Sequence, residues 1–288
     1  MNRLGIIGVG LLGSSVARAA RLHGLAGDIS GFDRDADNLA KAVSLGVLDR
    51  AANTPGEAAA GADLVVLAVP VGAMSSVLSE LKPYWAESTL YTDVGSTKQA
   101  LVETLQAVFG YIPSNFVPGH PIAGAEQSGV AAGRADLFDG KRVILTPCLE
   151  TSPAATAAIT TFWQHLGAIV APMEPLRHDR ILAATSHLPH VLAFVLTDLL
   201  GHMDDQDAIF QYAAGGFRDF SRIASSDPTM WRDICVANHA RIVPLIDDYC
   251  RALLAVRELI AHESASELHD LFSHARSARQ RFLNLSQQ

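Results

Sequence analysis

The chain has 288 residues, which is enough for about two domains of ordinary size. Hydrophobic residues make up 49 % of the chain and charged residues 18 %, a balance that is typical of a compact globular protein and excludes a long disordered tail. The net charge of −8 and the lack of a basic stripe argue against nucleic acid or an anionic membrane as a partner.

The three cysteines, Cys148, Cys235 and Cys250, lack the spacing of a metal site or a disulfide framework. This pattern predicts a reducing compartment and no bound metal. The chain also runs from Met1 straight into a strand-like stretch, which leaves no space for a signal peptide. We therefore expect a cytoplasmic protein.

The start of the chain has the pattern of a strand, a glycine turn and a helix. A short apolar run leads into G-V-G-L-L-G, and the residues that follow repeat at helical spacing. Gly8 permits a tight turn, Gly10 lets the backbone approach a pyrophosphate, and Gly13 lets the helix pack closely on the strand. The phosphates are expected at the free amides of the first helical turn, near Leu11 and Leu12. The stretch therefore predicts a dinucleotide-binding βα unit.

The acidic residue after the second strand predicts which dinucleotide binds. The apolar run Ile29–Phe32 ends in Asp33, about 20 residues after the glycine turn, where a carboxylate can accept hydrogen bonds from both ribose hydroxyls. The same carboxylate would repel a 2′-phosphate, which favours NAD over NADP. Arg34 could instead receive a 2′-phosphate, so NADP stays the alternative.

Two further strands are expected to end at the same edge of a parallel sheet. The β-branched run over residues 63–69 stops at Pro70, which places Val69 and Pro70 near the cofactor. The strand over residues 89–92 leads into D-V-G-S-T-K. Ser96 and Lys98 of that motif are candidates for touching the substrate or the nicotinamide, and Ser96 could also cap a helix over residues 98–109.

His120 lies between a strand end and a glycine-rich loop, in G-H-P-I-A-G-A-E-Q-S-G, and we expect it to face the ligand crevice. The sheet is expected to finish with strands over residues 142–146 and 169–171. From Pro175 onward only helical spacing remains. The chain is therefore predicted to be α/β, with a Rossmann-type dinucleotide-binding domain over residues 1–174 and an all-helical domain over residues 175–288.

The most apolar long stretch runs from Ile181 to Leu200, within a helical pattern from Leu176 to Leu200 that predicts a buried central helix of the second domain. Its polar residues, Asp198 among them, argue against a membrane span. Pro189 is expected to kink this helix. His187 and His190 sit three residues apart near the kink, so they are either satisfied core groups or part of a ligand site.

Two arginines four residues apart follow in G-G-F-R-D-F-S-R-I-A-S-S-D-P-T-M-W. Arg218 and Arg222 share one helix face, where they form either a clamp for a carboxylate or a solvated basic face with Asp219 as partner. Asp227 and Pro228 predict the start of the next helix.

Taken in order, the glycine turn with Asp33, D-V-G-S-T-K, H-P-I-A-G-A-E-Q-S-G, S-H-L-P-H and G-G-F-R-D-F-S-R-I-A-S-S-D-P-T-M-W closely resemble the prephenate dehydrogenase family over nearly the whole chain. The last three motifs carry most of this resemblance. It implies a homodimer formed through the helical domain, which oxidatively decarboxylates prephenate or its amino analogue arogenate with NAD on the route to tyrosine.

The resemblance also implies roles for single residues. His120 matches the catalytic histidine, which would accept the proton of the substrate's 4-hydroxyl, and Ser96 the serine that hydrogen-bonds beside it. His190 matches a histidine near the substrate's side chain, and Arg222 the arginine that holds a substrate carboxylate. The other residues expected at the substrate are Arg218, where some relatives have lysine, Glu126, which would help to set substrate preference, and His187.

Three alternatives remain. The enzyme could prefer arogenate or accept both substrates. It could be a two-domain dehydrogenase of β-hydroxy acids, although those use a lysine of the helical domain and this chain has none after Leu176. Finally, it could be a redox sensor that binds NAD without turnover, which would need neither His120 nor the paired arginines.

Overall fold

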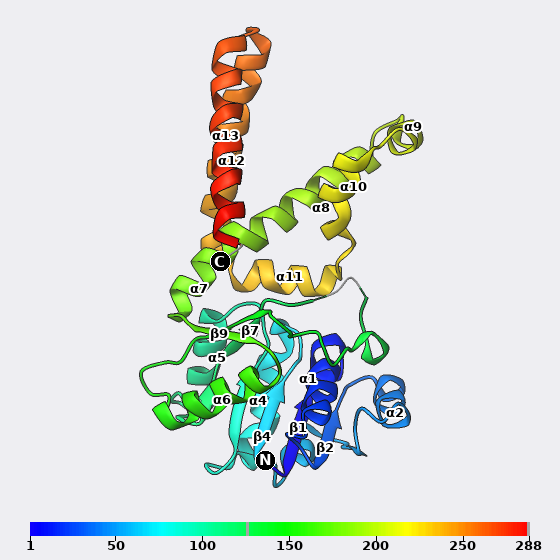
Figure 1. Cartoon of the computed structure of the whole chain (residues 1–288), viewed down its shortest axis with the longest axis vertical. Coiled ribbons are helices and arrows are strands. Elements are labelled where there is room, and N and C mark those ends of the chain that lie inside the picture. The colour runs from blue at the N-terminus through cyan, green and yellow to red at the C-terminus, as the bar shows by residue number, and fades with distance from the viewer. Residues whose placement is uncertain (125–126, 287–288) are drawn as a thin grey trace. The chain divides into compact units, whose positions relative to one another are not determined.

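The computed structural model describes residues 1–124 and 127–286. By its internal contacts the chain divides into two compact units, Met1–His239 and Ala240–Gln288. The first unit contains both sheets and the helices up to α11, and every candidate site residue falls within it (Figure 1).

The described residues form a six-stranded parallel sheet in the order β3-β2-β1-β4-β5-β6. Its strands are β1 (Arg3–Ile7), β2 (Asp28–Phe32), β3 (Arg50–Ala51), β4 (Leu64–Leu67), β5 (Leu90–Asp93) and β6 (Phe116–Val117). This is the strand order of the doubly wound dinucleotide-binding fold, and the order reverses between β1 and β4. The predicted fold class is therefore confirmed, and ligands of such sheets bind at the carboxyl edge beside this reversal.

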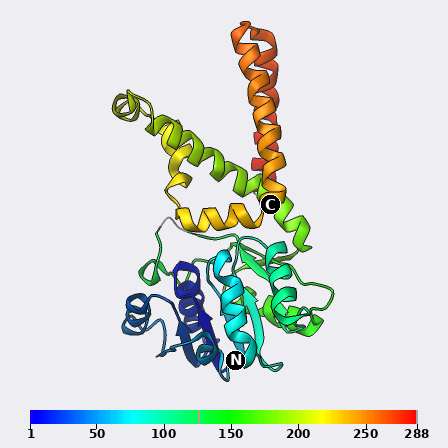
Figure 2. The same ribbon diagram turned by 180° about the vertical axis from the view of Figure 1, so that it is seen from behind.

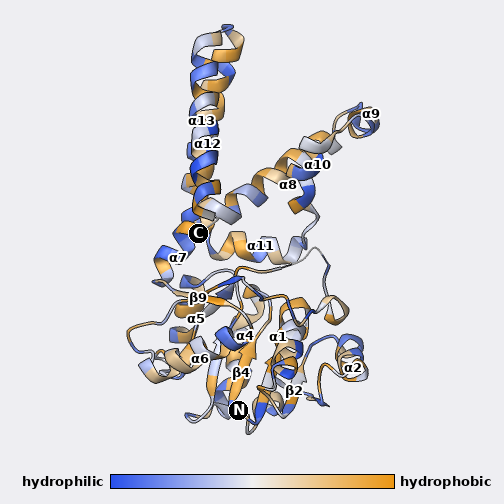
Figure 3. Cartoon of the chain, viewed as in Figure 1, coloured by the Kyte–Doolittle hydropathy of each residue, from blue (hydrophilic) through white to orange (hydrophobic). Residues whose placement is uncertain are grey.

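Helices cover both faces of the sheet, as the β-branched run of β4 predicts. One apolar cluster joins the sheet to α1 (Leu11–Leu22), α2 (Ala36–Ser44) and α6 (Pro153–His165). The other joins it to α3 (Pro55–Ala59), α4 (Met74–Leu81) and α5 (Gln99–Phe109). Figure 3 shows the strands as the most apolar part of this layered structure.

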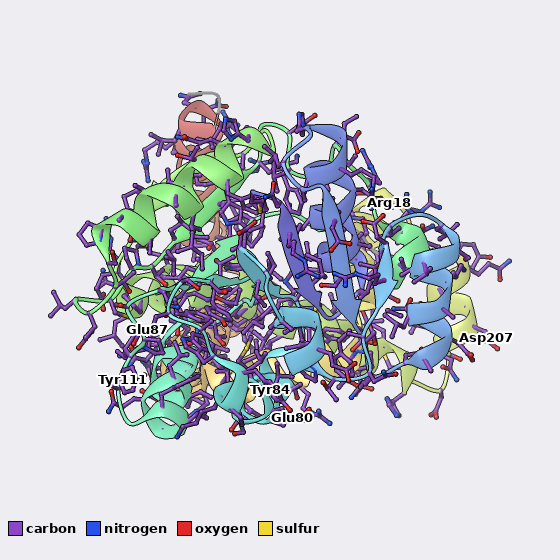
Figure 4. All side chains as sticks on the ribbon, turned by 90° about the horizontal axis from the view of Figure 1, so that it is seen from below. Arg18, Glu80, Tyr84, Glu87, Tyr111 and Asp207 are labelled. Atoms are coloured by element: carbon purple, nitrogen blue, oxygen red, sulfur yellow. The ribbon has the colours of Figure 1, made fainter. Side chains whose placement is uncertain are left out.

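The turns that follow α4 and α5 mark the amino edge of the sheet. Glu80, Tyr84, Glu87 and Tyr111 lie there, at the rim of the unit in Figure 4. The glycine turn and the ends of β4 and β5 lie at the opposite, carboxyl edge, which is where the sequence places the site.

The last three strands form a separate sheet, so the expectation that strands over residues 142–146 and 169–171 complete the main sheet is wrong. These strands are β7 (Gly119–Pro121), β8 (Arg142–Leu145) and β9 (Ile169–Pro172), with β7 antiparallel to β8 and β8 parallel to β9. Pro118 separates β6 from β7, and its missing amide hydrogen interrupts the ladder. The chain changes direction there and carries His120 into the smaller sheet.

Helices alone follow from Pro175 among the described residues of the first unit. They are α7 (Pro175–Leu182), a π-helical turn (Ala183–His187), α8 (Leu188–Gly201), α9 (Gln206–Gln211), α10 (Gly215–Ser221), the 3-10 turn η5 (Arg222–Ser225) and α11 (Pro228–Ala237). The predicted irregularity at Pro189 is present as the π turn before it, because proline cannot donate to the helical ladder. α11 packs on η1 (Val71–Ala73), the turn after β4, and α10 packs along α8 (Figure 2).

The helix Pro175–Gly201 is long and apolar enough to cross a membrane by length and composition, the one such helix among the described residues. Only 22 % of its most apolar window is buried, so the prediction of a buried central helix is wrong for the single chain. Val195 and Leu199 are each more than half exposed. Apolar periodicity cannot distinguish burial within one chain from burial against another molecule, which is why the sequence misleads here.

The second unit is a pair of long helices, α12 (His239–Ala261) and α13 (Ala265–Ser286), joined by a turn in which Glu263 has a positive φ of 51°. Several of its apolar side chains are more than half exposed: Leu253, Leu254, Ile260, Phe272 and Phe282.

Candidate active site

The glycine turn has the shape that a pyrophosphate requires. Gly8 has φ +90°, and a Cβ on it would lie 2.5 Å from the carbonyl oxygen of Ala68. A Cβ on Gly13 would lie 2.0 Å from the carbonyl oxygen of Gly8, so α1 can approach β1 only with glycine there. A Cβ on Gly10 would meet open space, directly beside the amides of Leu11 and Leu12 that begin α1. These residues fit a dinucleotide phosphate at the positive end of the helix.

Asp33 is held against this turn. Its Oδ2 accepts hydrogen bonds from the amide of Val9 at 2.8 Å and from Nδ2 of Asn38 at 3.1 Å. Asn38 also donates to the carbonyl of Val9, and its Oδ1 accepts from the amide of Val130. Arg34 is exposed beside it. The acid that favours NAD therefore lies at the predicted place, and Asn38, which the sequence did not single out, fixes it there.

The predicted residues after β4 lie next to the same turn. Val69 is partly exposed and Pro70 is exposed. A Cβ on Gly8 would come within 3.0 Å of a methyl carbon of Val69, which places the end of β4 against the glycine turn.

His120 is the end of a chain of three hydrogen-bonded side chains. Its Nδ1 lies 2.9 Å from Nε2 of His178, and Nδ1 of His178 lies 2.7 Å from Oδ1 of Asp179. His178 and Asp179 belong to α7. Asp179 also accepts hydrogen bonds from the amides of Lys98 at 2.8 Å and Gln99 at 2.9 Å, which caps the amino terminus of α5.

The pKa values along this chain indicate where the protons lie. Burial raises the pKa of Asp179, but hydrogen bonds from His178 and from the amides of Lys98 and Gln99 outweigh it and hold that pKa below its usual value. Asp179 is thus a carboxylate that accepts from Nδ1 of His178. Burial lowers the pKa of His178, so its ring is neutral and its Nε2 accepts the Nδ1 proton of His120.

The same reasoning leaves a lone pair on Nε2 of His120. Burial, the positive charge of Lys98 and the neighbouring imidazoles of His178 and His187 lower the pKa of His120 well below its usual value. The ring is therefore neutral near neutral pH, while part of its surface stays accessible. With Nδ1 donating to His178, Nε2 is the atom that can accept a proton.

A buried ion pair fixes the backbone beside His120. Nζ of Lys98 lies 2.5 Å from Oδ2 of Asp93 and donates to the carbonyl of Gly119 at 2.6 Å, while Oδ1 of Asp93 accepts from the amide of Gly119 at 2.9 Å. Lys98 is 0 % exposed, so the expectation that it touches substrate or nicotinamide is wrong. It ties the end of β5 to the start of β7.

Ser96 lies in the turn between β5 and α5 and is partly exposed. The alternative in which it caps this helix is wrong, because α5 begins at Gln99 and its first amides are capped by Asp179. A cap drawn from a residue about 80 positions away is invisible to local sequence patterns.

His190 and Arg222 come together on the helical side. Nδ1 of His190 donates to the carbonyl of Ser186 at 2.8 Å, and its ring stacks on Trp231 of α11 with centroids 3.7 Å apart. Burial lowers the pKa of His190, and the nearby charge of Arg222 lowers it further. His190 is therefore a neutral ring whose Nε2 can accept a hydrogen bond.

Arg218 and Arg222 lie in α10 and in the turn after it, and both are exposed. Arg222 lies close enough to His190 for its charge to act on that ring, whereas Arg218 lies within α10, one turn before Arg222. Glu126, predicted to help set substrate preference, lies outside the described residues. Trp231 was not expected at the site, and its place in the D-P-T-M-W motif is the one signal of it in the sequence.

His187 does not behave as a substrate contact. It is 1 % exposed, and its Nδ1 lies 3.1 Å from Nδ2 of Asn238, which also donates to the carbonyl of Asp179. We therefore correct its predicted role: it packs inside the unit, 6.0 Å from the Trp231 ring that supports His190.

The burial of His187 predicts an acid-dependent loss of stability. Burial lowers its pKa from 6.5 to about 4, so the unfolded chain binds the proton at a higher pH than the folded chain. Its contribution is intact above pH 6.5 and is lost as the pH falls toward about 4, by up to about 3 kcal/mol. Urea unfolding across this pH range should show a shallower fall for His187→Leu than for the parent protein. Parallel curves would exclude this role.

A cavity of about 360 Å3 lies at the carboxyl edge. It is lined by Val71 and Gly72 after β4, Gly95 after β5, and Asp233 of α11, among other residues. α11 therefore lies over the turns that follow β4 and β5, whereas His120 and the glycine turn are not among the residues that line this cavity.

Comparisons with known proteins agree with this arrangement. The family model described as prephenate dehydrogenase, nucleotide-binding domain, matches residues 16–171, and the one described as prephenate dehydrogenase, dimerization domain, matches residues 174–274. Cyclohexadienyl dehydrogenase of Zymomonas mobilis is 36 % identical over 281 residues, covering 96 % of this chain and 95 % of that protein. Prephenate dehydrogenase of Bacillus subtilis is 36 % identical over 278 residues, covering 95 % of this chain and 74 % of that protein.

Solved structures are similar over the full fold. Prephenate dehydrogenase from Aquifex aeolicus, in complex with hydroxyphenyl propionate and NAD+, superposes with a TM-score of 0.90 at 36 % identity and 98 % coverage of both chains. Synechocystis arogenate dehydrogenase superposes with a TM-score of 0.80 at 27 % identity, covering 97 % of this chain and 99 % of that one.

The sheet order, the glycine turn and the acid after β2 define a dinucleotide-binding protein, and the relatives named above show that it is a dehydrogenase. The chain belongs to the prephenate dehydrogenase family, and its cofactor is NAD.

Proposed function

We propose that this enzyme converts prephenate to 4-hydroxyphenylpyruvate and carbon dioxide with NAD+, in the biosynthesis of tyrosine. The observation that carries the proposal is the hydrogen-bonded chain that leaves Nε2 of His120 as a proton acceptor at the carboxyl edge of the nucleotide-binding sheet. The family membership and the named relatives support the substrate class.

The chemistry requires one base and one hydride acceptor. When bound, NAD+ accepts the hydride from the substrate carbon that carries the 4-hydroxyl. His120 takes the hydroxyl proton on Nε2 as the carbonyl forms, and Ser96 hydrogen-bonds to the same oxygen. When the bond to the ring carboxylate breaks, its electron pair restores an aromatic ring and the oxygen takes its proton back from His120. Release of carbon dioxide makes the reaction effectively irreversible.

Residues of α8, α10 and η5 are proposed to bind a carboxylate and the side chain of the substrate. Arg222 binds a carboxylate with its planar guanidinium group, and Arg218 adds a second positive charge. His190 contacts the substrate's side chain through Nε2. Glu126 contributes to substrate preference. The glycine turn, Asp33 and the residues after β4 hold the cofactor, in the set Gly8, Gly10, Leu11, Leu12, Gly13, Arg34, Val69 and Pro70.

An arogenate or dual-specificity enzyme is the second candidate, because relatives of both kinds are similar to this chain. Prephenate and arogenate differ only in a keto or amino group on the side chain, so few polar contacts decide between them. The test is to follow NADH formation with each substrate and to compare kcat/KM. We expect prephenate to have the higher kcat/KM. A higher value with arogenate would reverse the assignment, and no NADH with either would favour a non-catalytic NAD sensor.

We propose that the enzyme is a cytoplasmic homodimer whose interface includes the helical segments. A second copy of the chain would bury the exposed apolar residues of α8 and of the second unit. The family model that covers residues 174–274 is also named for dimerization. Sedimentation at micromolar concentration should give twice the mass of the chain. A monomer throughout that range would contradict the proposal.

The preference for NAD rests on Asp33. Asp33→Ser removes the acceptor for the ribose hydroxyls, so KM for NAD should rise about 10-fold or more, while use of NADP improves relative to NAD. Asp37→Ser, which removes an exposed acid of α2, is the matched control. An unchanged ratio of NAD to NADP efficiency would show that Asp33 does not select the cofactor.

A further inference from the structure

The strongest unassigned feature of the molecule is the pair His178–Asp179 on α7. Neither residue was predicted at the site, and both are buried. They connect two parts of the first unit. Asp179 caps α5, which packs on the large sheet, and accepts a hydrogen bond from His178. His178 in turn contacts His120 of the small sheet. Hydrogen bonds from two amides and one imidazole fix the position of the buried carboxylate of Asp179.

We propose that His178 and Asp179 are positioning residues that fix the tautomer of His120, so that Nδ1 carries the proton and Nε2 is the base. This rests on the proposed function, because it deepens the role given there to His120. The pair does not touch the substrate and acts only by orienting the ring of His120.

The direction of each hydrogen bond follows from Asp179. A carboxylate can only accept, so Nδ1 of His178 must donate to it. A neutral His178 then has only Nε2 left as an acceptor, and the 2.9 Å contact requires Nδ1 of His120 to donate. Without the carboxylate of Asp179 or the ring of His178, no hydrogen-bond acceptor of fixed orientation favours the Nδ1-protonated tautomer of His120. A wrong tautomer in an analogous acid-histidine pair of serine proteases costs about 10⁴-fold in kcat.

Several titratable groups surround His120. They are His178 and Asp179 from α7, Lys98 at the start of α5, Asp93 at the end of β5 and His187 in the π turn. Lys98 disfavours protonation of His120, and Asp93 and Asp179 are the negative charges nearby. Loss of Asp179 therefore removes a negative charge, which lowers the basicity of His120 and moves the acid limb of kcat/KM to lower pH.

Substitutions of His178 separate the effect on His120 from the capping of α5 by Asp179. His178→Leu leaves both amide bonds to Asp179 in place but removes the acceptor for Nδ1 of His120. His178→Gln retains one acceptor and one donor on a side chain of similar reach. We expect His178→Leu to lower kcat about 10²- to 10⁴-fold with NAD affinity unchanged, and His178→Gln to recover part of that loss.

The decisive readout is long-range 1H–15N NMR of the histidine rings in the NAD-bound protein, which reports the tautomer of His120 without turnover. The parent protein should show a protonated Nδ1 and a bare Nε2, and His178→Leu a mixture or the reverse. His187→Leu, which also removes a buried imidazole, should retain the parent tautomer.

The outcomes separate this inference from the proposed function. A parent protein with its proton on Nε2 of His120, or an unchanged tautomer in His178→Leu, overturns the inference whatever the substrate is. If the tautomers are as expected but neither prephenate nor arogenate gives NADH, the proposed function is overturned and the positioning role of His178 and Asp179 is supported.

Discussion

His120→Asn is expected to lower kcat by about 10²- to 10⁴-fold, the usual contribution of a general base. The asparagine amide can still donate a hydrogen bond to Nε2 of His178, so the buried network is retained. It cannot accept the proton of the 4-hydroxyl, because an amide is not a base near neutral pH. Steady-state kinetics with prephenate and NAD measure the loss.

Two controls make this result specific. NAD affinity of His120→Asn, measured by calorimetry, should equal that of the parent protein, because the glycine turn and Asp33 are untouched. His165→Asn, at the exposed end of α6, should leave kcat unchanged. Near-normal turnover by His120→Asn would rule out His120 as the base.

Arg222→Ala is expected to lower kcat/KM for prephenate by about 10- to 150-fold, mainly through a higher KM. The physical reason is the loss of a charge-assisted hydrogen bond to a substrate carboxylate, which contributes roughly 1.5 to 3 kcal/mol. The pKa of His190 should rise at the same time, because the positive charge of Arg222 lowers it in the parent protein. Substrate saturation curves and NMR titration of His190 measure the two effects.

The matched control is Arg21→Ala, which removes an arginine of similar exposure from the last turn of α1, at the other end of that helix from the glycine turn. It should leave KM for prephenate unchanged. If Arg222→Ala also had the parent KM, the carboxylate clamp would have to be assigned elsewhere.

The features of the fold that the sequence predicted well are local. Gly8, Gly10 and Gly13 act within one turn, and each is explained by the space that a Cβ would fill or leave open. Asp33 follows its strand directly, and the π turn before Pro189 is a consequence of one missing amide hydrogen.

The features that the sequence did not predict depend on residues far apart in the chain. His178 meets His120 across 58 positions, and Asp179 caps a helix 80 positions before it. In the linear pattern, the H-D pair of α7 looks like ordinary polar residues of a first turn. The same limitation explains the separate sheet of β7, β8 and β9 and the exposed apolar face of α8, since partner choice is not encoded in periodicity alone.

The imidazole of His120 in β7 and the guanidinium of Arg222 in η5 are expected to meet on one small carboxylate ligand beside the cofactor. A crystal structure of this enzyme with NAD+ and hydroxyphenyl propionate tests it most directly. We predict Nε2 of His120 at about 3 Å from the phenolic oxygen and the guanidinium of Arg222 on the carboxylate. His120 turned away from that oxygen, or Arg222 directed to solvent, would contradict the claim.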